Sequence, residues 1–138
     1  MTPDIVDVSF GWYHEAYIDK EGNLYVCAKA KMSSVKIKEL PDGVRDPLVK
    51  VTTLPKGTKV QQVTFTRQRM FVLGQDGKLF VFRIEEKAPS REDQIFSKMR
   101  PQFTGELLIE NHIVVKDLPP LRMIASGVDH IIMLDRNG

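Results

Sequence analysis

The sequence predicts an all-β fold made of repeated small antiparallel sheets, and three observations predict it. Short runs of Val, Ile, Leu, Phe and Tyr alternate along the chain with Gly, Pro, Asp and Asn, which is the pattern of strands and turns. An apolar period of about 3.6 residues, which would indicate helices, is not sustained over any long stretch. Three segments, 8–22, 63–77 and 124–138, align with one another without a gap. Such a repeat indicates a series of similar units.

The expected strands follow one another in chain order, each between two turn-forming segments. They are 16–18, 24–26, 60–65, 70–73, 79–84, 123–125 and 131–134. One short helix is expected over 90–98, because Ser90 can cap it and the acidic residues Glu92 and Asp93 favour its first turn.

Each aligned segment ends in a glycine, Gly22, Gly77 or Gly138, preceded by an acidic or amide residue. Glycine accepts a positive φ, so the apolar strand before each turn is expected to form a hairpin with the strand after it. One such sheet cannot cover both of its faces, and stacking against neighbouring repeats covers them. This is the arrangement of blades in a β-propeller.

The third segment contains Ile-Ala-Ser-Gly-Val-Asp-His, which includes Gly127 and His130, followed by an apolar strand and Asn-Gly. This pattern resembles the repeat of the regulator of chromosome condensation family, and the resemblance implies β-propeller blades of that type. The second segment departs from the pattern, with Thr66 in place of the glycine and Arg69 in place of the histidine. The structural positions of the repeat are Gly11, His14, Gly22, Gly77, Gly127, His130 and Gly138.

The whole chain, 1–138, is expected to form a partial propeller with repeats at about 1–46, 47–106 and 107–138, the last of them incomplete. Three hairpin segments correspond to about two and a half blades, whereas closed propellers have about four to eight. We therefore expect that the chain is a fragment, or that other material closes the ring. An open stack would leave a sheet edge prone to pairing with other chains.

The composition disfavours several functional classes. Twenty basic against eighteen acidic residues give a net charge of +2, too small to indicate broad binding to nucleic acid. In the basic stretch 29–38, Lys36 and Lys38 alternate with apolar residues, which fits one solvent-facing side of a strand, and lysines also protect strand edges. No apolar run is long enough to span a membrane, and the N-terminus lacks a secretory signal. The single cysteine, Cys27, excludes an intrachain disulfide and fits an intracellular protein of the cytoplasm or nucleus, with the mitochondrion as an alternative.

The sequence contains no recognisable catalytic, cofactor-binding or metal-binding motif. It has no Gly-x-Ser-x-Gly elbow, no phosphate-binding glycine loop and no Cys-x-x-Cys pair. His14 and His130 occupy equivalent places in the repeat, which indicates packing near the inner strand, whereas a metal site needs several converging ligands. We therefore predict no enzyme activity, no cofactor and no metal.

Two surfaces are candidates for binding a partner protein. The first is the long connection 85–100, with balanced charges and three apolar anchors; a solvated loop folded onto its own blade is the alternative. The second is the turn with Trp12 and Tyr13, which is expected to share one propeller face with Arg67; a packed turn is the alternative. The residues assigned to protein binding are Trp12, Tyr13, Arg67, Arg91, Phe96, Met99 and Arg100.

Together these inferences favour a protein-interaction or scaffolding propeller that is a subunit or fragment of a larger assembly. The family resemblance implies an alternative, a guanine-nucleotide exchange factor for a small GTPase. Such a factor distorts the nucleotide pocket of the GTPase and needs no catalytic residue or cofactor of its own. A propeller that binds a sugar or another small ligand is a third alternative. Since fold analogy does not fix function, the choice depends on the site.

Overall fold

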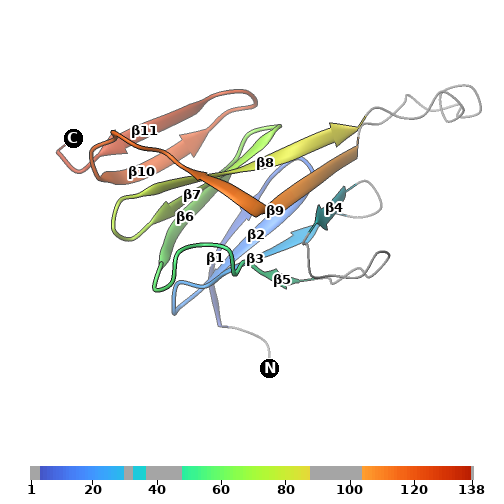
Figure 1. Ribbon diagram of the computed structural model, residues 1–138, viewed down its shortest axis with the longest axis horizontal. Coiled ribbons are helices and arrows are strands. Elements are labelled where there is room, and N and C mark those ends of the chain that lie inside the picture. The colour runs from blue at the N-terminus through green and yellow to red at the C-terminus, as the bar shows by residue number, and fades with distance from the viewer. Residues whose placement is uncertain (1–3, 30–32, 37–47, 88–103, 138) are drawn as a thin grey trace, which may run out of the picture.

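Three β-sheets lie side by side in the part of the chain that the structure describes (Figure 1). The computed structural model describes residues 4–29, 33–36, 48–87 and 104–137. The regular secondary structure in these residues consists of β-strands alone. The strands are β1 (Ile5–Phe10), β2 (His14–Asp19), β3 (Leu24–Ala28), β4 (Ser33–Lys36), β5 (Val49–Lys50), β6 (Val60–Phe65), β7 (Arg69–Gly74), β8 (Leu79–Lys87), β9 (Thr104–Val114), β10 (Leu121–Ser126) and β11 (Ile131–Asp135). The all-β prediction is confirmed.

The three sheets correspond to two blades and part of a third. The first sheet has the order β1-β2-β3-β5, the second has the order β4-β9-β8-β7-β6, and the third is the hairpin β10-β11. All neighbouring strands are antiparallel except β4 and β9, which run parallel. The expected partial propeller of about two and a half blades therefore agrees with the sheets that the structure describes.

The hairpin turns after β2 and β7 form as the sequence predicts. Gly22 has a φ of 86° and Gly77 a φ of 87°, a region of conformational space that favours glycine. Each turn also connects its sheet to the next one: the amide of Val60 donates to the carbonyl oxygen of Gly22 at 2.9 Å, and the amide of Leu121 donates to that of Gly77 at 3.0 Å. The third predicted turn glycine, Gly138, lies outside the described residues.

Apolar side chains fill the space between neighbouring sheets. The first cluster joins the first and second sheets and includes Ala16, Ile18, Leu24, Val26, Val63, Phe65, Met70, Val72, Phe80 and Phe82. The second cluster joins the second and third sheets and includes Phe71, Leu73, Leu79, Leu121 and Ile124. Each fully buried Val, Leu, Ile, Phe or Met side chain in these clusters stabilises the fold by about 1.5–3 kcal/mol, so stacking between sheets is a major source of stability.

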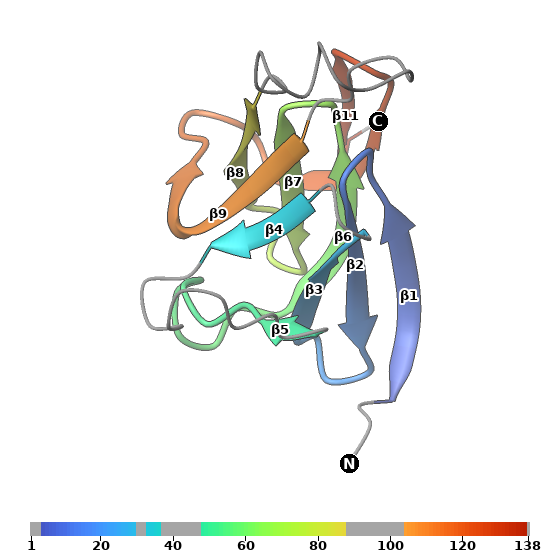
Figure 2. The same cartoon turned by 90° about the vertical axis from the view of Figure 1, so that its right-hand side faces the viewer.

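The sheets are offset from the sequence repeats. Strand β5, in the expected second repeat, pairs with β3 of the first sheet, and β9 crosses the expected boundary at 106. Strand β4, in the expected first repeat, pairs with β9, with Ser33 opposite Gly105 (Figure 2). The helix expected over 90–98 lies outside the described residues, and the start of the connection 85–100 is the end of β8.

Candidate protein-binding surface

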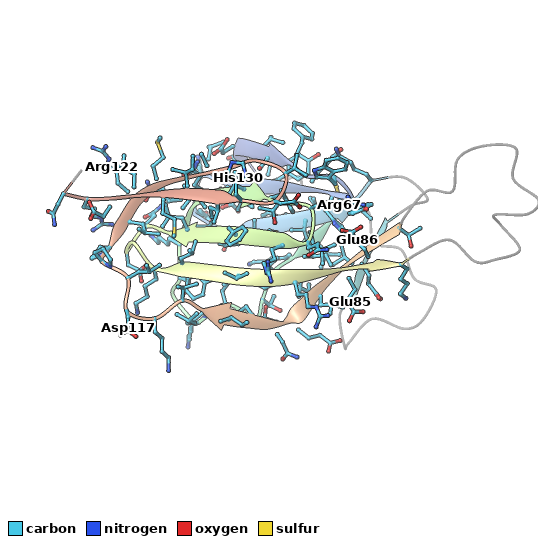
Figure 3. All side chains as sticks on the ribbon, turned by 90° about the horizontal axis from the view of Figure 1, so that it is seen from above. Arg67, Glu85, Glu86, Asp117, Arg122 and His130 are labelled. Atoms are coloured by element: carbon cyan, nitrogen blue, oxygen red, sulfur yellow. The ribbon has the colours of Figure 1, made fainter. Side chains whose placement is uncertain are left out.

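Three equivalent turns precede β2, β7 and β11, and they carry the sequence-predicted residues Trp12, Tyr13 and Arg67. In each turn the amide of residue 11, 66 or 127 donates to the carbonyl oxygen of the residue three positions later, at 2.8, 2.9 and 2.9 Å. The amide of Arg67 also donates to the carbonyl oxygen of Val128 at 2.8 Å, which fixes the second turn against the third. Figure 3 shows Arg67 close to Glu86, with Asp117 and Arg122 at the other end of the molecule.

Arg67 is the centre of this group of side chains. Its guanidinium carbon lies 5.8 Å from the ring centroid of Trp12, a cation–π geometry. Its Nε lies 3.1 Å from both carboxylate oxygens of Glu86. The Glu86 carboxylate raises the pKa of Arg67 above its ordinary value. Contacts on two sides therefore restrict a side chain that would otherwise be mobile.

The two aromatic residues of the first turn have different surroundings. Trp12 is 55% exposed, whereas Tyr13 is only 7% exposed. The Tyr13 hydroxyl donates to Glu86 Oε2 at 3.3 Å, and burial together with the Glu86 charge raises the pKa of Tyr13. Trp12 can therefore contact another molecule at the surface, while the buried Tyr13 fixes the position of Glu86 through its hydrogen bond.

Glu86 is the member of the group that sequence reasoning did not assign. It lies at the end of β8, 19 residues from Arg67 and 73 from Tyr13, and the sequence shows it only as one charge of the connection 85–100. The other residues assigned to protein binding, Arg91, Phe96, Met99 and Arg100, lie outside the described residues. Their assignment stays a prediction.

The repeat positions differ in burial between the first and third sheets. His14 is fully buried, which agrees with a packing role, whereas the equivalent His130 is exposed on the third sheet. A Cβ on Gly11 would lie 2.6 Å from Cγ of Phe65, so only glycine lets the Phe65 ring pack there. A Cβ on Gly127 would instead lie 2.3 Å from Cε1 of its own His130.

Cys27 lies on β3 and is half-buried. Its thiol donates to Glu15 Oε2 at 3.5 Å, and burial followed by the Glu15 charge raises the thiol pKa. The Tyr17 hydroxyl donates to the same carboxylate oxygen at 2.5 Å, and this bond raises the pKa of Tyr17 to about 12. A thiol that resists ionisation is a poor nucleophile, so this trio offers no activated group.

A recess of about 900 Å³ opens over β8 and β9 beside Glu86. Side chains of both charges line it, among them Arg69, Arg83, Glu85 and Glu110. Arg69 and Arg83 are directly opposite each other on paired strands, and in the described part of the chain neither forms an ion pair. Two like charges at such positions repel.

The variant Arg69→Glu is expected to be more stable than the wild type, because it replaces repulsion across β7 and β8 with an opposite-charge pair. The gain should be about 0.5–1 kcal/mol, measured by urea unfolding at low salt, and it should shrink as salt is added. Arg122→Glu makes the same change of net charge at an exposed position on β10. A loss of stability in the Arg69 variant relative to this control would contradict the prediction.

Within the residues that the structure describes, no group of three or more His, Cys, Asp or Glu side chains could hold a metal ion. Across the same residues, no helix is long and apolar enough to cross a membrane.

The arrangement of the sheets matches solved propellers. Human WBSCR16 superposes with a TM-score of 0.61 at 17% sequence identity, over 100% of this chain and 32% of its own. Prp20p of Saccharomyces cerevisiae, described with its binding properties to Gsp1p and histones, superposes with a TM-score of 0.63 at 14% identity. This match covers 98% of this chain and 32% of Prp20p. The chain has the fold of regulator of chromosome condensation propellers.

The family resemblance seen in the repeat pattern is therefore matched in three dimensions. The chain spans 32% of the length of each of these two propellers. No protein-family model and no curated protein matches the sequence. What the chain shares with the propellers of this family is the fold, and any function has to be argued from its own residues.

Proposed function

We propose that this chain is a protein-interaction segment of a propeller, and that it binds a partner protein through Trp12, Arg67 and Val128. We call these three residues the turn-end surface. The observation that carries the proposal is the exposed Trp12 ring beside an Arg67 side chain that Glu86 holds in place. Fold similarity to propellers such as Prp20p, whose description includes binding to other proteins, supports it.

The chemistry of this surface suits a protein interface. Tryptophan and arginine are enriched among the residues that contribute most binding energy, particularly next to apolar neighbours that exclude water. Val128, 46% exposed, supplies such a neighbour, and the bond from Arg67 to its carbonyl keeps the two turns in contact. Because Arg67 is already restrained, a partner that contacts it immobilises less side-chain freedom on binding.

Replacing Trp12 with alanine is expected to weaken partner binding by at least about tenfold, and Arg67→Ala should do the same. A photo-crosslinking residue at position 129, which is exposed beside Val128, would first identify the bound protein, and the dissociation constant of the purified pair would then be measured by calorimetry. Ile113→Ala is the matched control, because Ile113 is 69% exposed on β9, outside this surface.

Equal affinities for the Trp12 variant and the Ile113 control would overturn the proposal. A parallel substitution, Arg67→Lys, separates charge from geometry. Lysine keeps the positive charge but loses the planar group that stacks on Trp12 and pairs with Glu86, so we expect most of the loss seen with alanine.

Nucleotide exchange on a small GTPase is the second candidate function. Its support is the fold shared with Prp20p, whose description includes binding to Gsp1p. Release of a fluorescent nucleotide from a panel of small GTPases, with and without the chain, distinguishes the two functions. Accelerated release would favour exchange, while stable binding to a protein without acceleration would favour the interaction segment.

A further inference from the structure

The same irregularity occurs at the start of strands β1, β6 and β10. In each strand the second residue is an extra one that opposes no residue of the partner strand, so it forms a β-bulge. The extra residues stand at equivalent positions of the repeat and are Val6, Gln61 and Arg122. All three are exposed, because a bulge turns the side chain of its extra residue away from the regular alternation of the strand. We call these three residues the bulge row.

The bulge position is exposed even where a sheet lies on each side of it. The second sheet packs on the first sheet through one face and on the third sheet through the other. Gln61 in this sheet is nevertheless exposed, and so are Lys59 and Gln75 at the same end of it. The bulge row therefore lies on an end of the stacked sheets, and a further sheet beside them would leave it exposed.

Hydrogen bonds fix this end of the second and third sheets. Within the second sheet, the amide of Gln75 donates to the carbonyl oxygen of Lys59 at 2.8 Å. Two bonds then join the sheets: Gln61 Nε2 donates to the carbonyl oxygen of Arg122 at 3.1 Å, and Arg136 Nη2 donates to that of Gln75 at 2.6 Å. These bonds hold the backbone of Arg122 and the side chain of Arg136 against the second sheet, at the end where Lys59 lies.

Positive charge is concentrated at this end of the second and third sheets. In the part of the chain that the structure describes, Lys59, Arg122 and Arg136 are exposed and form no ion pair. The first sheet differs, because Lys20, which stands at the repeat position of Arg136, pairs with Asp4 at 3.5 Å. Three cations without a carboxylate partner therefore lie along one end of two adjacent sheets.

We propose that this end of the chain binds an acidic segment of a partner protein, with Lys59, Arg122 and Arg136 facing its carboxylates. Arginine suits this role, because its planar group can bond a carboxylate through two parallel N–H groups. The bond from Arg136 to Gln75 already restrains one of these side chains, which reduces the freedom lost on binding. The contact goes beyond the partner binding proposed above, because the bulge row lies at the start of the strands that end at the turn-end surface.

Acidic side chains at the same end favour a short protein segment over a nucleic acid. Figure 3 shows Asp117 at this end, apart from Arg122. Asp135, directly opposite Leu121, accepts the amide of Asn137 at 3.1 Å. A nucleic acid duplex carries one negative charge per about 1.7 Å along its axis, so these two carboxylates would repel it. The carboxylates of an acidic peptide are spaced along a flexible chain and can reach the cations alone.

The test uses the full chain and a fluorescein-labelled oligoglutamate peptide as the acidic segment. Fluorescence anisotropy at low salt measures the dissociation constant of the complex. Arg122→Glu is expected to weaken binding about fivefold to tenfold, and Lys59→Glu should act in the same direction. Arg83→Glu is the matched control, because it makes the same change of net charge at an exposed position on β8, and it should bind the peptide like the wild type.

Far-ultraviolet circular dichroism checks that every variant is folded, and Arg122→Gln repeats the test with a variant that removes the charge without adding one. A wild-type chain that does not bind the peptide overturns the proposal. Equal losses in the Arg122 and Arg83 variants also overturn it, because they would show attraction to the net charge of the chain alone. A single-stranded oligonucleotide that binds more tightly than the peptide, and that Arg122→Glu weakens, would assign this end to nucleic acid and overturn the acidic segment.

Discussion

Replacing Asp19 with alanine is expected to lower the stability of the chain by about 2–3 kcal/mol, measured by urea unfolding at neutral pH. Asp19 is 6% exposed at the end of β2, where its carboxylate holds the first hairpin turn. It accepts bonds from the amides of Glu21 and Asn23 at 3.0 and 2.8 Å, from Asn23 Nδ2 at 3.0 Å and from the Tyr25 hydroxyl at 3.2 Å. Alanine leaves all four donors without this partner.

The effect should extend beyond the turn itself. The carbonyl oxygen of Gly22, in the same turn, accepts the amide of Val60 from the second sheet, and a Cβ on Gly22 would lie 2.8 Å from Cβ of Lys59. A loosened turn therefore weakens the contact between the first two sheets. Asp76→Ala is the matched control, since Asp76 lies in the equivalent turn of β7 and β8 but is exposed and accepts one backbone bond, from Lys78 at 3.0 Å. Equal losses in the two variants would contradict the argument.

Asp19 also gives the stability a defined pH dependence. Burial raises the pKa of its carboxyl, but the hydrogen bonds from Asn23, Glu21 and Tyr25 outweigh burial and hold the pKa below its ordinary value. The unfolded chain therefore binds the proton more tightly than the folded chain. The contribution of Asp19 is fully present above the ordinary carboxyl pKa of about 4 and is lost as the pH falls through the lower, folded value. In Asp19→Asn this part of the acid dependence should be absent.

The strands and hairpins were predictable because the residues that determine them are close together in the sequence. Gly22 and Gly77 mark turns that need positive φ, and alternating apolar residues on either side define the strands. The pairing of β4 with β9 was not predictable, since Ser33 and Gly105 are far apart in the sequence and a strand of four residues carries little register information.

The candidate surface was predictable only in part, for a related reason. The repeat alignment placed Trp12 and Arg67 at the same position of successive turns. In the structure the guanidinium carbon of Arg67 lies 5.8 Å from the ring centroid of Trp12. Glu86 lies outside the aligned repeat positions. Its ion pair with Arg67 could therefore not be predicted from the sequence and is seen only in the structure. Gln62 is similar: its side chain bonds both the amide and the carbonyl of Ile124, at 2.9 and 2.7 Å, across two sheets.

The loss of the repeat glycine in the second segment has a physical explanation in the neighbouring sheets. Between the first and second sheets, Gly11 makes room for Phe65. Between the second and third sheets, Thr66 stands at the position of Gly11 and is larger than glycine. Ser126 stands at the position of Phe65 and is smaller than phenylalanine. Thr66 is 5% exposed, and the Ser126 hydroxyl donates to the carbonyl oxygen of Phe65 at 2.6 Å. At the position of Gly11 a glycine is therefore needed because the facing residue is a phenylalanine, and at the position of Thr66 it is not, because the facing residue is a serine.

A double-mutant cycle at Gly11 and Phe65 is expected to show strong coupling for this reason. Gly11→Thr places a side chain within the Phe65 ring and should cost about 1–3 kcal/mol by overpacking. Phe65→Ser removes a buried ring and should cost about 3–5 kcal/mol. The double variant reproduces the Thr66 and Ser126 combination, so its loss should fall short of the sum of the two by about 1–2 kcal/mol. Urea unfolding of the wild type, the two single variants and the double variant measures the coupling energy. Strictly additive losses of stability would contradict the prediction, because they would show that a smaller residue at position 65 does not relieve the overpacking by threonine at position 11. Because Gly11 has no positive φ, the cost of the single threonine variant is steric, and the smaller residue opposite relieves it.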